Sequence, residues 1–430
     1  MTISNEIGAL AQSLWTATAP EPAVWPVLGE ELSADICVIG GGISGLSTAL
    51  HAAEAGQSVV LIEAETPGWG ASGRNGGQVL PGLKENPREV VAHFGEIGKR
   101  MVAVTGAAPD LVFDLIRRHG IDCGARQAGW VHAAVAHGLE GARDRAAQWR
   151  ALGVDIRDLS AAETREVLGG GQYAGALLDP RGGGVQPLAY SQGLAAAAAK
   201  AGVRIFAGTR AEALAQGVDG WIVATPKGRV RAGQVVICTN GYSGPLDARV
   251  MRNVVPIRSI QVATDPLPAD FTPDILPGGQ VVSDTQKHLL YFRRDADGRF
   301  VMGGAGAYAD AALERAFDRL KHHALELYPQ LKGQVWRYRW GGNVAVTVDH
   351  LPHLAELAPG LHALIGLNGR GVAAATALGR VMATRLGGER PEALDYPVRD
   401  LKLIPFHRFH RHGVRMVMLW AALQDRLKIG

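Results

Sequence analysis

The chain has few cysteines, a modest share of charged residues and no long apolar run. Its 430 residues include only three cysteines, Cys37, Cys123 and Cys238, without the paired spacing of a zinc or redox motif. No stretch reaches the ~18 consecutive apolar residues of a membrane-spanning helix, and no basic leader precedes an apolar segment near the N-terminus. We therefore expect a cytoplasmic protein without disulfides or a metal site, whose cysteines are small packing residues.

The net charge is only +3, from 44 Lys and Arg against 41 Asp and Glu, so the body of the protein has no strongly basic surface for nucleic acid. The exception is 401–430, where Asp425 is the sole acid beside the basic residues Lys402, Arg408, Arg411, Arg415, Arg426 and Lys428. Apolar residues recur there at helical spacing: Met416, Leu419, Trp420, Leu423 and Leu427. This helix could lie on a membrane surface, but we favour docking on its own domain.

Glycine, in contrast, is abundant at 56 residues, and the densest group follows an apolar strand over 36–39. The run Gly40-Gly41-Gly42-Ile43-Ser44-Gly45 then opens a helical pattern that ends near Gly56. Gly40 permits a sharp turn, Gly42 lets the backbone approach a pyrophosphate, and Gly45 lets the helix pack on the strand. The phosphates would then meet a helix N-terminus. The pattern predicts a dinucleotide site with backbone contacts at Gly40, Gly42, Ile43, Ser44 and Gly45.

A second apolar strand over 59–62 ends at Glu63, followed by Ala64, about twenty residues beyond the glycines. A carboxylate at this position accepts hydrogen bonds from ribose hydroxyls and argues against a 2′-phosphate. The ligand is therefore predicted to be FAD or NAD rather than NADP.

The segment 68–78, which reads GWGASGRNGGQ, decides between FAD and NAD. It resembles the signature of the D-amino-acid oxidase and sarcosine oxidase superfamily, and within it the gamma-glutamylputrescine oxidase-like amine oxidases. A glycine-rich surface turn is the alternative. In that family the loop runs along the flavin, which implies FAD contacts at Ser72, Gly73, Arg74, Asn75, Gly76, Gly77 and Gln78.

The resemblance extends over nearly the whole chain. It includes a lead-in over 13–22, a segment over 183–187 in which Gln186 replaces the more frequent acid, a strand and turn over 235–241, and a second glycine turn over 366–372. In the family this second turn aims backbone amides at the pyrimidine end of the flavin. The resemblance implies further FAD contacts at Ala211, Thr239, Asn240, Gly241, Gly342, Gly366, Leu367, Asn368, Gly369, Arg370, Gly371 and Val372.

The implied fold is α/β: a Rossmann-like FAD-binding domain interleaved with an α+β, antiparallel-sheet substrate domain, as in glutathione-reductase-like flavoproteins. A length of 430 residues suits two domains. We predict that the FAD-binding domain consists of 1–95, 170–250 and 340–400. The substrate domain would take 96–169 and 251–339, leaving 401–430 as a basic amphipathic extension.

Substrate residues are predicted in two strands of the second domain. In the run 336–340 (WRYRW), alternation places Trp336, Tyr338 and Trp340 on one face and the two arginines on the other. Tyr338 and Trp340 would form a wall of the amine pocket or belong to the sheet core.

A hairpin is read from 289–293, a turn at 295–298 and 299–302. It carries Tyr291 as a further candidate and Arg293, whose guanidinium could clamp a substrate carboxylate, as in many members of the family, or lie on a solvated strand edge. His350 is interpreted as structural, and no side chain is assigned as a catalytic base.

The implied reaction is FAD-dependent oxidation of an amine, by hydride transfer to the flavin N5. It gives an imine, then an aldehyde and ammonia or a smaller amine, with O2 reduced to H2O2. No cysteine follows Cys238 and Gln78 stands where some relatives have a histidine, so the FAD is expected to be non-covalent. The segment 299–306 lacks the lysine that sarcosine oxidases place near the ring, which puts rapid oxygen reduction in doubt.

Two alternatives stay open at this stage. An amino-acid dehydrogenase would pass electrons to another acceptor and touch a membrane through 401–430. A non-catalytic or RNA-modifying flavoprotein on the same scaffold is the more distant one.

Overall fold

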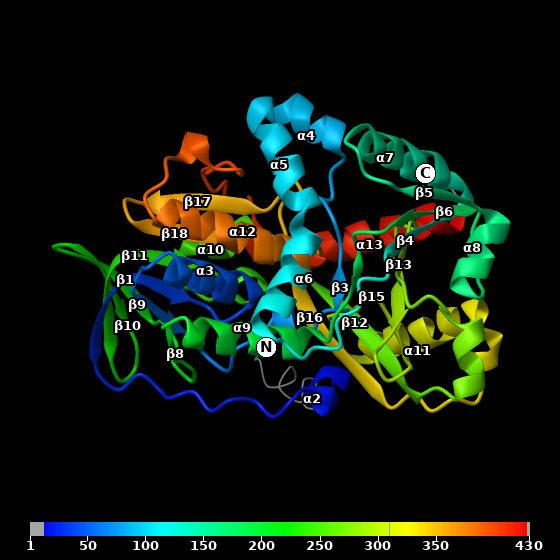
Figure 1. Cartoon of the computed structure of the whole chain (residues 1–430), viewed down its shortest axis with the longest axis horizontal. Helices are drawn as coiled ribbons and strands as arrows, with labels where there is room; N and C mark the ends of the chain where they lie inside the picture. The colour runs from blue at the N-terminus through cyan, green and yellow to red at the C-terminus, as the bar shows by residue number, and fades with distance from the viewer. Residues whose placement is uncertain (1–12, 309, 428–430) are drawn as a thin grey trace.

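The computed structural model describes residues 13–308 and 310–427, and within them two eight-stranded sheets lie side by side (Figure 1). The first sheet has the order β17-β18-β11-β1-β2-β8, with β10 and β9 added beside β11. Its strands are β1 (Glu31–Ile39), β2 (Val59–Ile62), β8 (Arg204–Phe206), β9 (Ala213–Gly217), β10 (Gly220–Ala224), β11 (Arg229–Ile237), β17 (His353–Ala358) and β18 (Leu361–Ile365).

Parallel pairing aligns the strand ends of the first sheet. Ile39 of β1 lies opposite Ile62 of β2 and Ile237 of β11, and Ile237 in turn lies opposite Ala363 of β18. Strands β2 and β18 are buried apolar runs, and β1 and β11 are buried and apolar toward their carboxyl ends, as expected where a sheet is covered on both faces. Because their carboxyl ends share one edge, the segments that follow them, including both predicted glycine turns, meet there.

Helix α3 (Ile43–Glu54) packs against both α9 (Pro187–Lys200) and α12 (Gly371–Leu386) beside this sheet. Their small residues allow the close approach, since a Cβ on Gly379 of α12 would lie 2.6 Å from the Ser47 Cβ of α3. The other α-helices in the described residues are α2 (Leu14–Thr18), α4 (Pro87–Phe94), α5 (Glu96–Gly106), α6 (Ala108–His119), α7 (Leu139–Ala151), α8 (Ala161–Leu168), α10 (Ala248–Asn253), α11 (Asp310–Leu327) and α13 (His410–Leu427).

The second sheet has the order β16-β12-β15-β14-β13-β4-β6-β5, antiparallel except for the parallel pair β13 and β4. Its strands are β4 (Trp130–Ala134), β5 (Arg157–Ser160), β6 (Gly175–Asp179), β12 (Val255–Pro266), β13 (Val281–Asp284), β14 (Tyr291–Arg294), β15 (Arg299–Ala305) and β16 (Tyr338–Val346). The predicted hairpin is confirmed as β14 and β15 around the turn at 295–298. A small sheet of β3 (Gln78–Val79) and β7 (Gly183–Gly184) lies between the two large ones.

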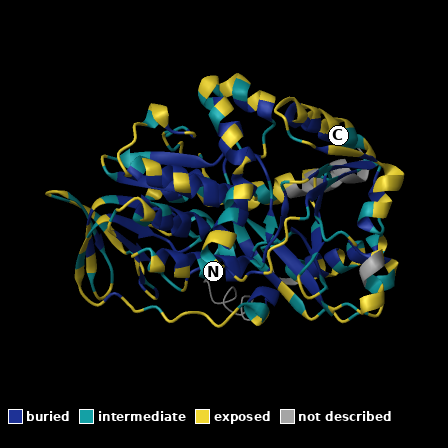
Figure 2. Cartoon of the chain, viewed as in Figure 1, coloured by how far each residue is buried: buried dark blue, intermediate teal, exposed yellow. Residues whose placement is uncertain are grey.

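Alternation gives the second sheet two different faces. Val131, Val282, Phe292 and Met302 form an apolar core with α11, whereas the opposite face is turned toward loop 70–78. Figure 2 shows that buried residues are concentrated in the two sheets and that exposed ones lie mainly on the outer helices and loops.

The chain passes from the second sheet to the first at later positions in the sequence than the predicted domain boundaries. Strand β6, inside the predicted FAD segment 170–250, pairs with β4 and β5 of the second sheet. Strand β16 runs through the predicted boundary at 339 and stays paired with β12 up to Val346. The glycines at 169–171 end α8 rather than a domain, and the chain leaves the second sheet at the later glycines, 182–184.

Two side-chain predictions need correction. Strand β16 begins at Tyr338, so Trp336 does not share its face and packs on Phe300 under α11, with ring centroids 6.3 Å apart. In α13, the Met416 and Trp420 side chains are 71% and 61% exposed, so the helix does not bury these two residues on its own domain. The side chains of the other stripe residues, Leu419, Leu423 and Leu427, lie outside the described part.

No helix in the described ranges is both long enough and apolar enough to cross a bilayer.

Candidate active site

The turn from β1 into α3 has the steric requirements that the sequence predicted. Gly40 has a φ of 111°, a Cβ on Gly45 would lie 2.0 Å from the Gly40 carbonyl oxygen, and a Cβ on Gly42 would lie 2.9 Å from the Ser72 Oγ. At the start of α3, the Ile43 N–H donates to the Ser72 Oγ at 2.9 Å, while Gly42 offers no side-chain cap. A helix N-terminus with close backbone and a hydroxyl beside it suits a pyrophosphate.

Glu63 lies at the end of β2, beside this turn. Its carboxylate accepts the Gly41 N–H at 2.6 Å and the Glu65 N–H at 2.9 Å. Burial raises the pKa of Glu63, and the two N–H donors oppose that rise. The Thr209 N–H donates to the Glu63 carbonyl at 2.8 Å, which brings the segment that carries Ala211 alongside. The structure thus gathers Glu63, Ser72 and the glycine turn at one sheet edge.

In loop 70–78, two predicted cofactor residues stabilise the loop itself. The buried Arg74 donates from Nε to the Trp69 carbonyl at 2.9 Å, and its guanidinium lies 4.4 Å from the Trp69 ring centroid. Asn75 donates from Nδ2 to the Ala71 and Ser72 carbonyls at 3.1 and 2.8 Å. These side chains fix the path of the backbone. The groups that the loop can offer to a ligand are therefore its main-chain carbonyls and its glycines.

Two of the four glycines of this loop, Gly76 and Gly77, lie directly against other segments: Gly76 against the second sheet, and Gly77 against Arg293 of that sheet and the segment after β7. A Cβ on Gly76 would lie 2.7 Å from the Tyr291 ring, and one on Gly77 would lie 2.1 Å from the Val185 carbonyl oxygen. Gln78 follows and donates from Nε2 to the Val282 carbonyl at 2.8 Å. The loop is therefore held between the helices beside the first sheet and the loop-facing side of the second sheet, which we call its open face.

Arg293 is a buried side chain that binds main-chain carbonyls, so the solvated-edge interpretation was wrong. Its Nε donates to Gly76 at 2.8 Å and its Nη2 to Val185 at 2.7 Å, and its guanidinium lies 5.0 Å from the Trp15 ring centroid. Burial lowers its pKa to about 10. It also borders a cavity of about 190 Å³ that Trp15 and Gln186 help to line. A carboxylate-clamping role stays a prediction.

Of the aromatic candidates, Tyr291 is the one beside the loop glycines. Its hydroxyl pairs with the Ser259 Oγ at 2.9 Å. Trp340 is 1% exposed, donates from Nε1 to the Arg74 carbonyl at 2.9 Å and meets Trp15 edge-on at 5.5 Å between centroids. Tyr338 packs against the same cluster. The geometry of Trp340 and Tyr338 favours the sheet-core interpretation.

The second glycine turn joins β18 to α12 at the same sheet edge. Gly366, Asn368 and Gly369 have φ values of 74°, 51° and 82°, so the backbone turns back sharply before α12 begins. The Gly366 N–H donates to the Asn240 Oδ1 at 2.8 Å, and the Thr347 N–H donates to the Asn368 Oδ1 at 2.9 Å. Main-chain amides at the start of a sixteen-residue helix are suited to stabilising an anion.

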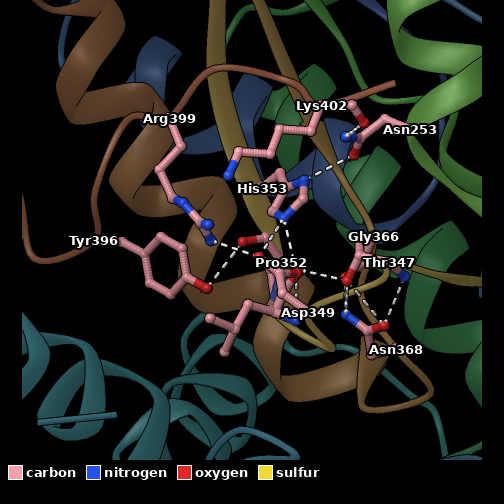
Figure 3. Close-up of polar contacts among 11 residues, drawn as sticks. Asn253, Thr347, Asp349, Pro352, His353, Gly366, Asn368, Tyr396, Arg399 and Lys402 are labelled. Carbon is pink, nitrogen blue, oxygen red and sulfur yellow. Dashed lines mark hydrogen bonds and ion pairs between the residues drawn. The ribbon is translucent and has the colours of Figure 1, made fainter. Parts of the chain in front are cut away.

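A cluster of polar side chains lies next to this turn (Figure 3). Asp349 lies 3.0 Å from the His353 Nε2 and 2.9 Å from the Arg399 Nη1, and the His353 Nδ1 lies 2.7 Å from the Asn253 Oδ1. Tyr396 donates to the Pro352 carbonyl at 2.9 Å. His350 has a φ of 56° and an Nδ1 3.4 Å from the Lys84 Nζ, and nothing places it in the cluster.

Sequence reasoning missed Gln261, a buried residue of β12. It donates from Nε2 to the Arg74 carbonyl at 2.6 Å, and its Oε1 has no hydrogen-bond partner among the described residues. That oxygen lies 3.7 Å from where a Cβ on Gly76 would be. The sequence feature that could have identified Gln261 is a polar residue at a loop-facing position of an otherwise apolar strand. A buried acceptor left open beside Gly76 fits a flavin or an amine as its donor.

The site therefore fits FAD: the two glycine turns, Glu63, Ser72 and the open acceptor of Gln261 all meet around loop 70–78. No cluster of potential metal ligands occurs within the described ranges.

Comparisons with known proteins agree with the geometry. A family model described as FAD dependent oxidoreductase (DAO) matches residues 35–385. The chain is 31% identical over 423 residues to a gamma-glutamylputrescine oxidoreductase of Escherichia coli K12, covering 97% of this chain and 99% of that one.

Among solved structures, glycine oxidase of Geobacillus kaustophilus gives a TM-score of 0.69 at 23% identity, covering 84% of this chain and 96% of that one. L-proline dehydrogenase of P. horikoshii gives 0.69 at 20% identity, covering 84% and 95%. At these identities the likeness shows the fold, an α/β flavoprotein fold with a Rossmann-like cofactor domain. From the family match across most of its length, the chain belongs to the DAO family of FAD-dependent oxidoreductases.

Proposed function

We propose that this protein oxidises an amine of the gamma-glutamylputrescine type to an imine, which water converts to an aldehyde and ammonia or a smaller amine. The observation that carries the proposal is the end-to-end similarity to gamma-glutamylputrescine oxidoreductase. The site supports it, because the open face of the second sheet offers an aromatic ring, Tyr291, and a buried acceptor, Gln261, at the loop that would hold the flavin.

When bound, FAD supplies the hydride acceptor. The chain's own residues would hold it: Gly42 and Ser72 the pyrophosphate, Glu63 the ribose, and the amides of 366–371 the ring end at which charge develops. Tyr291 and Gln261 would orient the amine and exclude water from it. No side-chain base is required if the amine enters neutral.

The FAD is proposed to be held without a covalent bond. Burial raises the pKa values of Cys37 and Cys238 to about 12 each, so both thiols stay protonated at neutral pH. The side-chain amide of Gln78 donates to the Val282 carbonyl.

O2 is the proposed electron acceptor, and the product would then be H2O2. The alternative is a dehydrogenase with another acceptor, touching a membrane peripherally. The observation that favours the alternative is α13, on which the exposed Met416 and Trp420 lie near Arg411 and Arg415. In either case we infer a cytoplasmic enzyme.

The test is anaerobic mixing of the yellow holoenzyme with a panel of amines, followed by air. Bleaching of the flavin band by gamma-glutamylputrescine, then prompt recolouring with one equivalent of H2O2, is the expected result. Slow recolouring in air with rapid recolouring by a quinone would support the dehydrogenase alternative. If neither amines nor amino acids bleach the flavin, the proposed function is wrong.

A further inference from the structure

Arg370 lies at the junction of three parts of the protein. These are the second glycine turn, the segment up to Pro81 that continues loop 70–78, and the second sheet. It is the residue before α12, and its Nη1 donates to the Pro81 carbonyl at 2.9 Å. Its guanidinium lies 5.1 Å from the ring centroid of Trp130, a residue of β4. Trp130 is on the loop-facing side of the second sheet, since its neighbour Val131 lies in the core beneath. The side chain thus spans the junction of the two domains.

This guanidinium has no counter-ion within the described ranges. No carboxylate there comes within ion-pair distance of it, and the Pro81 carbonyl is its one hydrogen-bond acceptor. Asp179 is the acid whose charge acts on Arg370, but both of its oxygens are taken by Arg181, the shorter contact being 2.6 Å. Burial and the nearby Arg145 lower the pKa of Arg370 to about 9, which still leaves it charged at neutral pH.

The surroundings add positive potential. Arg145 is buried and donates to the carbonyls of Leu83 at 2.7 Å and Glu85 at 3.1 Å, with no acidic partner of its own in the described chain. Lys84 lies in the same loop, where burial and Arg370 lower its pKa and the neighbouring Glu85 opposes that change. A partly buried cation without an anion is less favourable than one that a ligand's anion neutralises.

Two aromatic rings lie beside this cation. The His132 ring stacks on Trp130 with centroids 5.0 Å apart. Burial, reinforced by Arg145 and Arg370, lowers the pKa of His132 to about 3, so the imidazole is neutral at physiological pH. Trp130 and His132 therefore form an uncharged aromatic pair on the loop-facing side of the second sheet, beside the Arg370 guanidinium.

We propose that Arg370 binds a carboxylate of the substrate, with Lys84 at the rim, so that the preferred substrates are amines carrying a carboxylate at the end distant from the reacting nitrogen. A guanidinium offers two parallel N–H donors to a carboxylate, which an ammonium cannot do. Arg293 is less suited, because two of its nitrogens already bind the Gly76 and Val185 carbonyls. This inference rests on the proposed function and specifies its substrate class.

The experiment compares two amines with the same reacting end. Gamma-glutamylputrescine carries the distant carboxylate, and N-acetylputrescine has the same diamine and an amide without it. For the wild type, kcat/KM should be higher for the carboxylate-bearing amine. In Arg370→Met that ratio should fall about 10- to 100-fold, the range expected for hydrogen bonds to a charged group. Arg370→Lys should keep part of the preference.

A binding measurement avoids turnover. Gamma-glutamylbutylamide has the carboxylate but no reacting amine, and its Kd, from its perturbation of the flavin spectrum, should rise in Arg370→Met by a similar factor. Arg385→Met is the matched control, since Arg385 lies near the other end of α12, partly buried and paired with Glu356 at 2.8 Å. The control should leave the substrate ratio within about twofold of wild type.

The outcomes separate the two proposals. If wild type oxidises neither amine, the proposed function fails. If wild type oxidises both and Arg370→Met lowers both kcat/KM values equally, the proposed function stands and the carboxylate site is overturned.

Discussion

The edge of the first sheet and the open face of the second sheet contribute to one site in different ways. At the edge, the critical contacts join residues close in sequence, such as Gly40 with Gly45, or residues that follow aligned strands. On the open face, Trp130, Gln261 and Tyr291 come from three strands that are distant in sequence. The cofactor side is thus set by local backbone sterics, and the substrate side by long-range sheet pairing.

The largest effect is expected from Gly45→Ala, which attacks the cofactor side. The new Cβ would lie 2.0 Å from the Gly40 carbonyl oxygen, a backbone atom that cannot move without opening the turn. We expect loss of bound FAD, measured as a fall in the ratio of absorbance at 450 nm to that at 280 nm by more than about tenfold, together with a lower thermal midpoint.

Gly141→Ala is its control. Gly141 is also helical, in α7, and a Cβ there meets nothing within 4 Å. Full FAD content and equal or slightly higher stability are expected, since alanine is the better helix former. If Gly45→Ala kept its FAD, the account of the cofactor side as a steric turn would have to be given up.

This contrast explains what the sequence could predict. The first glycine turn, the strand that ends at Glu63 and the hairpin of β14 and β15 were readable because spacing and alternation are local. The crossing after β6 was not, since glycines at 169–171 and at 182–184 look alike until pairing with β4 is known. Arg370 was predicted as a backbone contact, because nothing in 366–372 tells that its side chain reaches Pro81 and Trp130.

Trp340→Ala should have the next largest effect and tests the second sheet. Trp340 is almost fully buried against Trp15, and it donates to the Arg74 carbonyl. Its removal should lower the free energy of unfolding by about 3–5 kcal/mol. Trp340→Phe keeps most of the volume and should cost about 1 kcal/mol, because Gln261 still donates to that carbonyl.

Thermal unfolding followed by circular dichroism and by release of flavin fluorescence measures both Trp340 variants. Trp420→Ala is the control, since that side chain is 61% exposed, and it should change stability by no more than about 0.5 kcal/mol. Equal shifts for Trp340→Ala and Trp420→Ala would contradict the assignment of Trp340 to the core.

The smallest effect is expected at the polar cluster behind the second glycine turn, and it depends on pH. Burial alone would raise the pKa of Asp349, but hydrogen bonds and charge from His353 and Arg399 hold it well below its usual range. A carboxylate whose pKa is lower in the folded state contributes stability above its unfolded pKa, ~3.9, and loses it as the pH falls toward the folded value.

Asp349→Asn should therefore be less stable than wild type at pH 7, by no more than about 1 kcal/mol because the carboxylate is partly open to solvent. The difference in thermal midpoint should stay constant from pH 7 to about 5 and shrink below about 4. Arg399→Gln should show the same trend, since it removes the charge on the other side of Asp349. A difference that grew in acid would mean that Asp349 is protonated in the folded protein, and that the support behind the cofactor turn is a neutral hydrogen-bond network.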